Sequence, residues 1–101
     1  PALSRARTIC SRVATVGFDW PTPEAVLEKL DEETREVHAA IASGDRDAIE
    51  DEIGDMLFVI ANLARKLDVD AESALRRANL KFTRRFREVE TRLTAVGLSL
   101  Q

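Results

Sequence analysis

The stretch KLDEETREV, residues 29–37, is followed by EIGD at residues 52–55, and both segments carry acidic side chains three residues apart. On an α-helix each residue turns by about 100°, so residues three or four apart share a face. Measured from the apolar Leu30, Glu33 lies about 60° away, whereas Glu32 lies about 160° away. Glu32 is therefore expected on the solvent face, and Glu33 is expected to border the core.

Other acidic residues of the two segments lie at similar angles. Glu36 lies about 120° from Leu30 on the side of Glu33. In the second segment Glu52 lies about 40° and Asp55 about 100° from the apolar Met56. Burying an unpaired carboxylate costs several kcal/mol or forces it to keep a proton. These acids therefore need a positively charged partner.

A divalent cation is the partner that this pattern favours. If the two helices pack antiparallel, as their short connection implies, their acids come together as oxygen ligands, which suit Mg²⁺, with Mn²⁺ as a substitute. The predicted ligands are Glu33, Glu36, Glu52 and Asp55. The alternative is ordinary ion pairing with Lys29, with Arg35 or with residues of the last helix.

Apolar residues recur at helical spacing along the chain, with no alternation typical of strands. The expected apolar stripes of the two acidic segments are Val26, Leu27, Leu30, Val37 and Ile41, and Ile49, Ile53, Met56, Ile60, Leu63 and Leu67. Thr22 before Pro23 is a good helix start, and Gly17 and Gly97 follow apolar stripes that end there. The sequence thus predicts an all-α, four-helix bundle in a single domain, residues 1–101. The expected helices cover roughly 3–16, 23–42, 47–67 and 71–96.

Composition excludes several classes of protein. A formal net charge of −3 without a basic stripe argues against binding a nucleic-acid polymer, and no apolar run is long enough for a membrane span. The lone Cys10 rules out a disulfide framework, so we expect a cytoplasmic protein. A chain of 101 residues buries only a small core, which favours a homodimer or homotetramer. The start at Pro1 is typical of a processed protein or of a piece of a longer one.

The last helix supplies cations at the edge of its apolar face. Arg85 and Lys81 lie about 60° and 100° from Phe82 on the same side. Such a pair next to a metal site suits a polyphosphate, because Arg contacts phosphate oxygens with two donors and Lys acts as a point charge. Pairing of both cations with the acids is an equal alternative.

Two further residues are candidate substrate contacts. Asn62 lies about 120° from Met56 on the side of Asp55, where it contacts substrate or makes a helix-packing hydrogen bond. Trp20, in the linker before residue 23, is able to stack on a nucleobase, although such rings more often anchor a loop or a subunit contact.

With these residues noted, the chain resembles the MazG family of all-α nucleoside triphosphate pyrophosphohydrolases, in particular its C-terminal catalytic domain. The resemblance covers essentially the whole chain. The matching segments, in order, are RVATVGFDWP, the E-E-x-x-E element of residues 32–36, EIGD, NLARKL and RANLKFTRRFREVE.

The resemblance implies hydrolysis of a nucleoside triphosphate between its α- and β-phosphates, in the service of cleaning the nucleotide pool. The family's metal ligands fall on Glu33, Glu36, Glu52 and Asp55, and its phosphate contacts fall on Lys29, Lys81 and Arg85. Of these residues, Glu36, Glu52, Lys81 and Arg85 are the expected catalytic ones. The alternative is a MazG-like helical dimer that binds nucleotides or a protein with little or no turnover.

Overall fold

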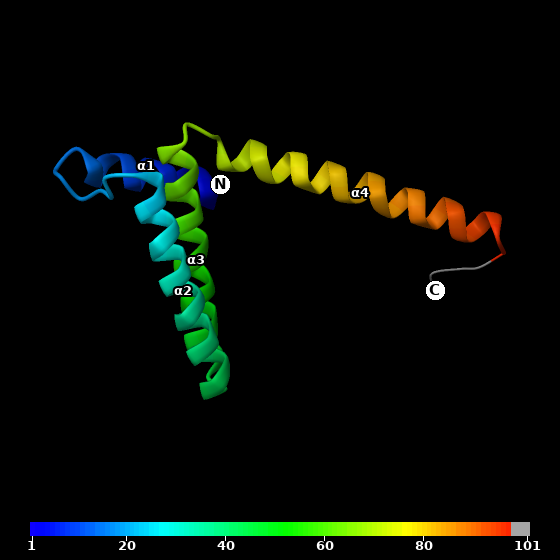
Figure 1. Cartoon of the computed structure of the whole chain (residues 1–101), viewed down its shortest axis with the longest axis horizontal. Helices are drawn as coiled ribbons and strands as arrows, with labels where there is room; N and C mark the ends of the chain where they lie inside the picture. Colours follow the sequence, from blue (N-terminus) through cyan, green and yellow to red (C-terminus); the bar gives the residue numbers. More distant parts are fainter. Residues whose placement is uncertain (98–101) are drawn as a thin grey trace. The chain divides into compact units, whose positions relative to one another are not determined.

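A computed structural model describes residues 1–97, and that part of the chain is all helical, without a strand (Figure 1). The all-α prediction is therefore confirmed. The expected helix bounds differ from the observed ones by at most two residues. The helices are α1 (Ala2–Ala14), α2 (Pro23–Ser43), α3 (Arg46–Lys66) and α4 (Ala71–Ala95).

Local chemistry sets the ends of α2 and α3. The Thr22 hydroxyl accepts a hydrogen bond from the Ala25 N–H at 3.2 Å, which satisfies one of the free donors of the first turn. Gly44 ends α2 with a φ of 71°, a left-handed conformation that suits glycine. Asp45 then caps α3 through its carboxylate, which accepts from the Asp47 N–H at 3.0 Å. This cap starts α3 one residue before the expected Asp47.

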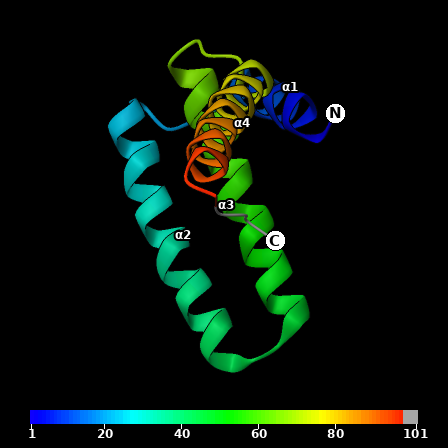
Figure 2. The ribbon, with the colours of Figure 1, turned by 90° about the vertical axis from the view of Figure 1, so that its right-hand side faces the viewer.

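Residues Pro1–Ala71 form one compact unit, which contains α1, α2 and α3. The two longer helices run antiparallel as a hairpin, and α1 packs against α3 (Figure 2). The antiparallel arrangement expected for α2 and α3 is thus present. Their contact places the acidic segments of both helices side by side. The buried apolar residues of this unit are Cys10, Val26, Ala40, Val59 and Ala61.

Several residues of the expected apolar stripes are not buried. Leu27 and Ile41 of α2 are exposed, and so are Ile53 and Ile60 of α3, whereas the unforeseen Val59 is 5% exposed. The difference arises because α3 is covered only where it packs against α2 and α1, and periodicity does not tell which apolar residues face a neighbour. A stripe of α3 consequently remains uncovered in this unit.

The second unit begins at Glu72 and holds nearly all of α4, which is described by itself. None of the residues of α4 is buried, although Phe82 and Phe86 follow each other by one turn on an apolar stripe. Within residues 1–97 no helix combines the length and the apolar character needed to cross a membrane.

Candidate metal and substrate site

Carboxylates from α2 and α3 meet in one cluster. Glu33, Glu52 and Asp55 each offer an oxygen atom, and these atoms lie within 4.8 Å of one another. The hairpin produces this arrangement, since Glu33 projects from α2 toward the segment of α3 that carries EIGD. Three of the four expected ligands are therefore close enough to share an ion. Glu36 is outside this close group, and its side chain is exposed.

Glu33 is the most deeply placed acid of the cluster, with 7% of its surface exposed. Its Oε1 lies 3.2 Å from the Nζ of Lys29, one turn earlier on α2. Its Oε2 is buried without a hydrogen-bond partner. Leaving a buried carboxylate oxygen without a partner is costly, so such an atom needs an explanation. The expectation that Glu33 borders the core is confirmed.

Glu52 lies in an electrostatically unfavourable position. Partial desolvation raises its pKa above the usual value, and the negative charges of Glu36, Asp55 and Glu33 raise it further. The exposed Glu36 thus influences the cluster although it stands apart from the other three acids. Within residues 1–97 the ion pairs of the structure do not include Glu36, Glu52 or Asp55. Ordinary ion pairing therefore accounts for Glu33 alone.

Lys29 is the cation of this region. Besides its contact with Glu33, its Nζ lies 3.7 Å from Glu32 Oε2. The hydrogen bond to Glu33 is the main cause that raises the pKa of the Lys29 ammonium. Lys29 is thus firmly charged and adjacent to the cluster, at a position from which it can also face an anionic ligand. Arg35, the other cation considered on α2, is exposed.

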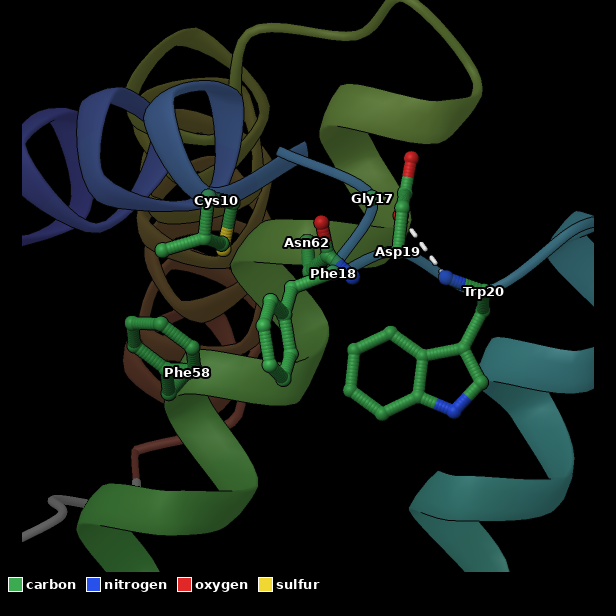
Figure 3. Close-up of a pocket in the computed structure, with 8 residues that line it drawn as sticks. Cys10, Gly17, Phe18, Asp19, Trp20, Phe58 and Asn62 are labelled. Atoms are coloured by element: carbon green, nitrogen blue, oxygen red, sulfur yellow. Dashed lines mark hydrogen bonds between the residues drawn. The ribbon is translucent and has the colours of Figure 1, made fainter. Parts of the chain in front are cut away.

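A pocket of about 410 Å³ lies beside the C-terminal half of α3 (Figure 3). Figure 3 shows Phe18 and Trp20 projecting from the loop between α1 and α2, next to α3. The two residues expected as further substrate contacts, Trp20 and Asn62, are brought together here. The pocket is lined by Cys10, Val13, Gly17, Phe18, Asp19, Trp20, Phe58 and Asn62.

Charged residues that the sequence analysis did not single out hold the loop of this pocket in place. Asp19 Oδ1 lies 2.7 Å from Arg65 Nη2, and its Oδ2 lies 2.9 Å from Lys66 Nζ. These hydrogen bonds, led by that of Lys66, hold the pKa of Asp19 below its ordinary value of 3.8. Arg65 follows Asn62 by three residues on α3, and that spacing was the available signal for its role. Nothing local could pair it with Asp19, 46 positions away.

The acid cluster and the pocket share α3. Asn62 follows Asp55 by seven residues, which turns it only about 20° from Asp55 and advances it about 10 Å along the helix axis. A single straight helix therefore presents an anionic cluster at one point and a largely apolar pocket two turns further on. This separation is comparable to that between a nucleobase and the phosphates of the same nucleotide.

The expected phosphate contacts Lys81 and Arg85 both lie on α4. They are one turn apart, on one side of the helix, and both are exposed. Because α4 belongs to the second unit, their placement stays a prediction.

The sequence that forms this all-α hairpin and its acid cluster matches the model of a known protein family. Residues 21–90 match the model of the MazG nucleotide pyrophosphohydrolase domain, which is more than half of the chain. The chain belongs to this family, and the resemblance expected from the motifs is confirmed.

Two relatives show how the chain compares with longer proteins. It is 48% identical over 101 residues to the nucleoside triphosphate pyrophosphohydrolase/pyrophosphatase MazG of Thermotoga maritima, covering 100% of this chain and 38% of the relative. It is 51% identical over 102 residues to the nucleoside triphosphate pyrophosphohydrolase of Escherichia coli K12, covering 99% of this chain and 39% of the relative. The chain thus spans well under half the length of these relatives, whose names describe hydrolases of acid anhydrides.

Proposed function

We propose that this chain hydrolyses nucleoside triphosphates between the α- and β-phosphates, releasing the nucleoside monophosphate and pyrophosphate. Family membership and the names of the relatives support the reaction class. The observation that carries the proposal is the buried, unpartnered Oε2 of Glu33 in a cluster with Glu52 and Asp55. An acid cluster lacking compensating charge is the arrangement expected of a site for a metal ion and its phosphate ligand.

Mg²⁺ is the proposed ion, with Mn²⁺ as a substitute, because hard divalent cations prefer oxygen ligands. Glu33, Glu52 and Asp55 would hold it, and Glu36 would join them from the exposed side of α2. A bound ion would supply Lewis acidity toward phosphoryl oxygens and lower the pKa of a coordinated water. The charge of the cluster fits this role, since within residues 1–97 only Glu33 of these acids has an ion-pair partner.

The substrate would lie along α3, with its phosphates at the acid cluster and its base in the pocket. Trp20 would stack on the base, because indole offers a large π-face at the edge of an otherwise apolar cavity. The advance of about 10 Å from Asp55 to Asn62 leaves room for the sugar between these two points.

The remaining predicted residues would act on charge and protons. Lys29, next to Glu33, would contact phosphate oxygens, and Lys81 and Arg85 would offset the charge on the departing pyrophosphate. Glu36, whose side chain is free and exposed, would orient the attacking water.

We further propose a homodimer or homotetramer acting in the cytoplasm on canonical or damaged nucleotides. The uncovered stripe of α3 supports self-association: Ile53, Leu57 and Ile60 are 45%, 50% and 40% exposed and lie within about 60° of one another around the helix. A helix of a second copy would cover this stripe and complete the bundle.

Pyrophosphate release tests the proposed reaction. Each common NTP and dNTP is incubated with the full chain, with Mg²⁺ and then with EDTA, and pyrophosphate is distinguished from orthophosphate. Glu52→Gln should abolish release while circular dichroism shows unchanged helices. Glu50→Gln is the matched control, because Glu50 is an exposed acid on the opposite side of α3.

Each result separates the alternatives. Metal-dependent pyrophosphate release lost in Glu52→Gln alone supports the proposal. Orthophosphate release excludes α–β cleavage. Intact Mg²⁺ binding without turnover of any nucleotide would instead favour a nucleotide-binding module.

A further inference from the structure

The orientation of the Asn62 side-chain amide is set by its neighbour. The Nε of Arg65 donates to Asn62 Oδ1 at 2.9 Å. A guanidinium group has donors only, so it can face the amide oxygen but not the amide NH₂. The contact therefore identifies which end of the amide is the oxygen: Oδ1 faces Arg65, and Nδ2 points away from it.

The free end of the amide is accessible from the pocket. Asn62 lines the pocket and retains only 2% exposure, and Nδ2 has no hydrogen bond to any residue in 1–97. In residues 1–97, Glu33 Oε2 is the one side-chain nitrogen or oxygen that is both fully buried and without a hydrogen-bond partner. Because Asn62 Nδ2 also has no partner, it must retain some accessible surface. The small accessible area of Asn62 thus presents a hydrogen-bond donor to whatever occupies the pocket.

Asp19 is the charged side chain among the lining residues, and its two carboxylate oxygens are already engaged. They accept from Arg65 and Lys66 and from the backbone N–H of Trp20 (Figure 3). Cys10 adds no charge, because burial raises the pKa of its thiol. Among the lining side chains an amino group would meet no acceptor that is not already engaged, whereas an oxo group would accept from Asn62.

We propose that Asn62, oriented by Arg65, makes this pocket prefer bases with an oxo group where their counterparts carry an amino group. Uracil is then favoured over cytosine, and hypoxanthine over adenine. This inference rests on the proposed function for the placement of the base, and it adds the chemical rule by which bases are selected. A site whose buried donor is left unpaired by the wrong ligand discriminates strongly against that ligand.

Asp19 extends the same network to the stacking ring. Its Oδ1 accepts both from Arg65 Nη2 at 2.7 Å and from the Trp20 N–H at 2.9 Å. The carboxylate that holds Arg65 against Asn62 therefore also holds the backbone of Trp20. Asp19 and Arg65 are positioning residues, since neither needs to touch the base.

Binding of nucleoside monophosphates to the full chain in Mg²⁺ tests the inference without any turnover, because a monophosphate has no bond between α- and β-phosphates to hydrolyse. Trp20 is the single tryptophan, so its fluorescence reports on the pocket directly. UMP is compared with CMP, and IMP with AMP. The oxo member of each pair should bind roughly tenfold more tightly, as expected for one well-made hydrogen bond in place of an unsatisfied amino group.

Asn62→Asp is the decisive variant. An aspartate keeps the contact with Arg65 but presents an acceptor to the pocket, so the preference within each pair should reverse toward the amino member. Asn62→Leu removes both the donor toward the pocket and the acceptor for Arg65. It should bring the ratio of the dissociation constants within each nucleotide pair close to one. Asn79→Asp, at an exposed position of α4, is the matched control and should leave the ratios unchanged.

Every outcome bears on the inference. Equal affinity within both pairs, or ratios that Asn62→Asp leaves unchanged, would overturn it. Absence of any monophosphate-dependent change at Trp20 in a chain that still releases pyrophosphate from NTPs would also overturn it, while leaving the proposed function intact. An oxo preference that reverses in Asn62→Asp, in a chain without turnover, would support the pocket rule and refute the proposed reaction.

Discussion

Glu33 combines deep burial, one cation and one unpartnered oxygen, and this combination makes its behaviour depend on a bound ion. Without an ion, its neighbours Glu52 and Asp55 add negative charge that nothing in residues 1–97 neutralises by an ion pair. An ion that binds only the folded cluster stabilises the fold by mass action, by about 2.7 kcal/mol at a hundredfold excess over its Kd.

Glu33→Gln should therefore remove the stabilisation of the chain by Mg²⁺. We expect the midpoint of thermal unfolding of the unchanged chain to rise with Mg²⁺ and to fall back with EDTA, whereas that of Glu33→Gln should respond little. Glu50→Gln should respond like the unchanged chain. Differential scanning fluorimetry across a Mg²⁺ series measures this, and an equal Mg²⁺ response of Glu33→Gln would exclude Glu33 as a ligand.

Asp19 makes the stability of the pocket loop depend on pH. Its pKa in the fold is lower than in the unfolded chain, because Lys66 and Arg65 donate to its carboxylate. The unfolded chain therefore binds the proton more readily, and the stabilisation by Asp19 is complete above its ordinary value of 3.8 and is lost as the pH falls through the lower folded value.

Asp19→Asn should accordingly have a lower free energy of unfolding than the unchanged chain at neutral pH. In acid the two free energies should become more nearly equal, because the Asp19 carboxylate of the unchanged chain is then protonated. Urea unfolding of both proteins, at a series of pH values from neutral to about 3, gives the difference directly. The gap should narrow as the pH drops below the ordinary pKa of aspartate. A gap that is constant over this range would show that the Asp19 ion pairs contribute nothing to stability.

Helix α3 carries the acid cluster and the pocket amide on one face, two turns apart, and an uncovered apolar stripe on another face. Gly54 lies in its interior, and a Cβ built there meets no atom within 4 Å. Glycine in a helix interior is less favourable than alanine by about 0.5–1 kcal/mol, chiefly because the unfolded chain has more conformations to lose.

Gly54→Ala should thus raise the free energy of unfolding by about 0.5–1 kcal/mol. Urea unfolding at a protein concentration low enough to disfavour association measures it. Repeating the experiment at high concentration adds information, because destabilisation confined to high concentration would place a second chain against Gly54. Destabilisation at both concentrations would contradict the prediction.

The apolar stripe of α3 is the surface through which we propose that whole chains associate. Leu57, at its centre, is 50% exposed, and a charge at this position would have to be buried if a second copy covered the stripe. Leu57→Glu should therefore convert the proposed dimer or tetramer into a monomer, as measured by sedimentation equilibrium.

Ser4→Glu is the control for Leu57→Glu, since it adds the same charge at an exposed position of α1. It should leave the association state unchanged. A monomeric parent chain at micromolar concentration, or an unchanged assembly of Leu57→Glu, would show that the stripe is not the contact surface.

Helical periodicity was sufficient to foresee the four helices, the inward position of Glu33 and the outward position of Glu32, because these depend only on angles within one helix. It was also sufficient to bring Glu33 of α2 close to Glu52 and Asp55 of α3, since a short turn between two helices leaves an antiparallel hairpin as the simple outcome. The fourth expected ligand, Glu36, stands apart from this group. It failed for Ile41 and Ile53, which are apolar but exposed.

Contacts between distant segments could be found only in the folded chain. Periodicity placed Trp20 and Asn62 separately, but the path of the loop after α1 brought them to one pocket, and Asp19 met Arg65 across 46 positions. The physical reason is that a helix fixes the directions of its own side chains through short-range hydrogen bonds, whereas the partner on a neighbouring element depends on how the elements pack. The amino-acid order thus established which side chains point inward, and packing alone established what they meet.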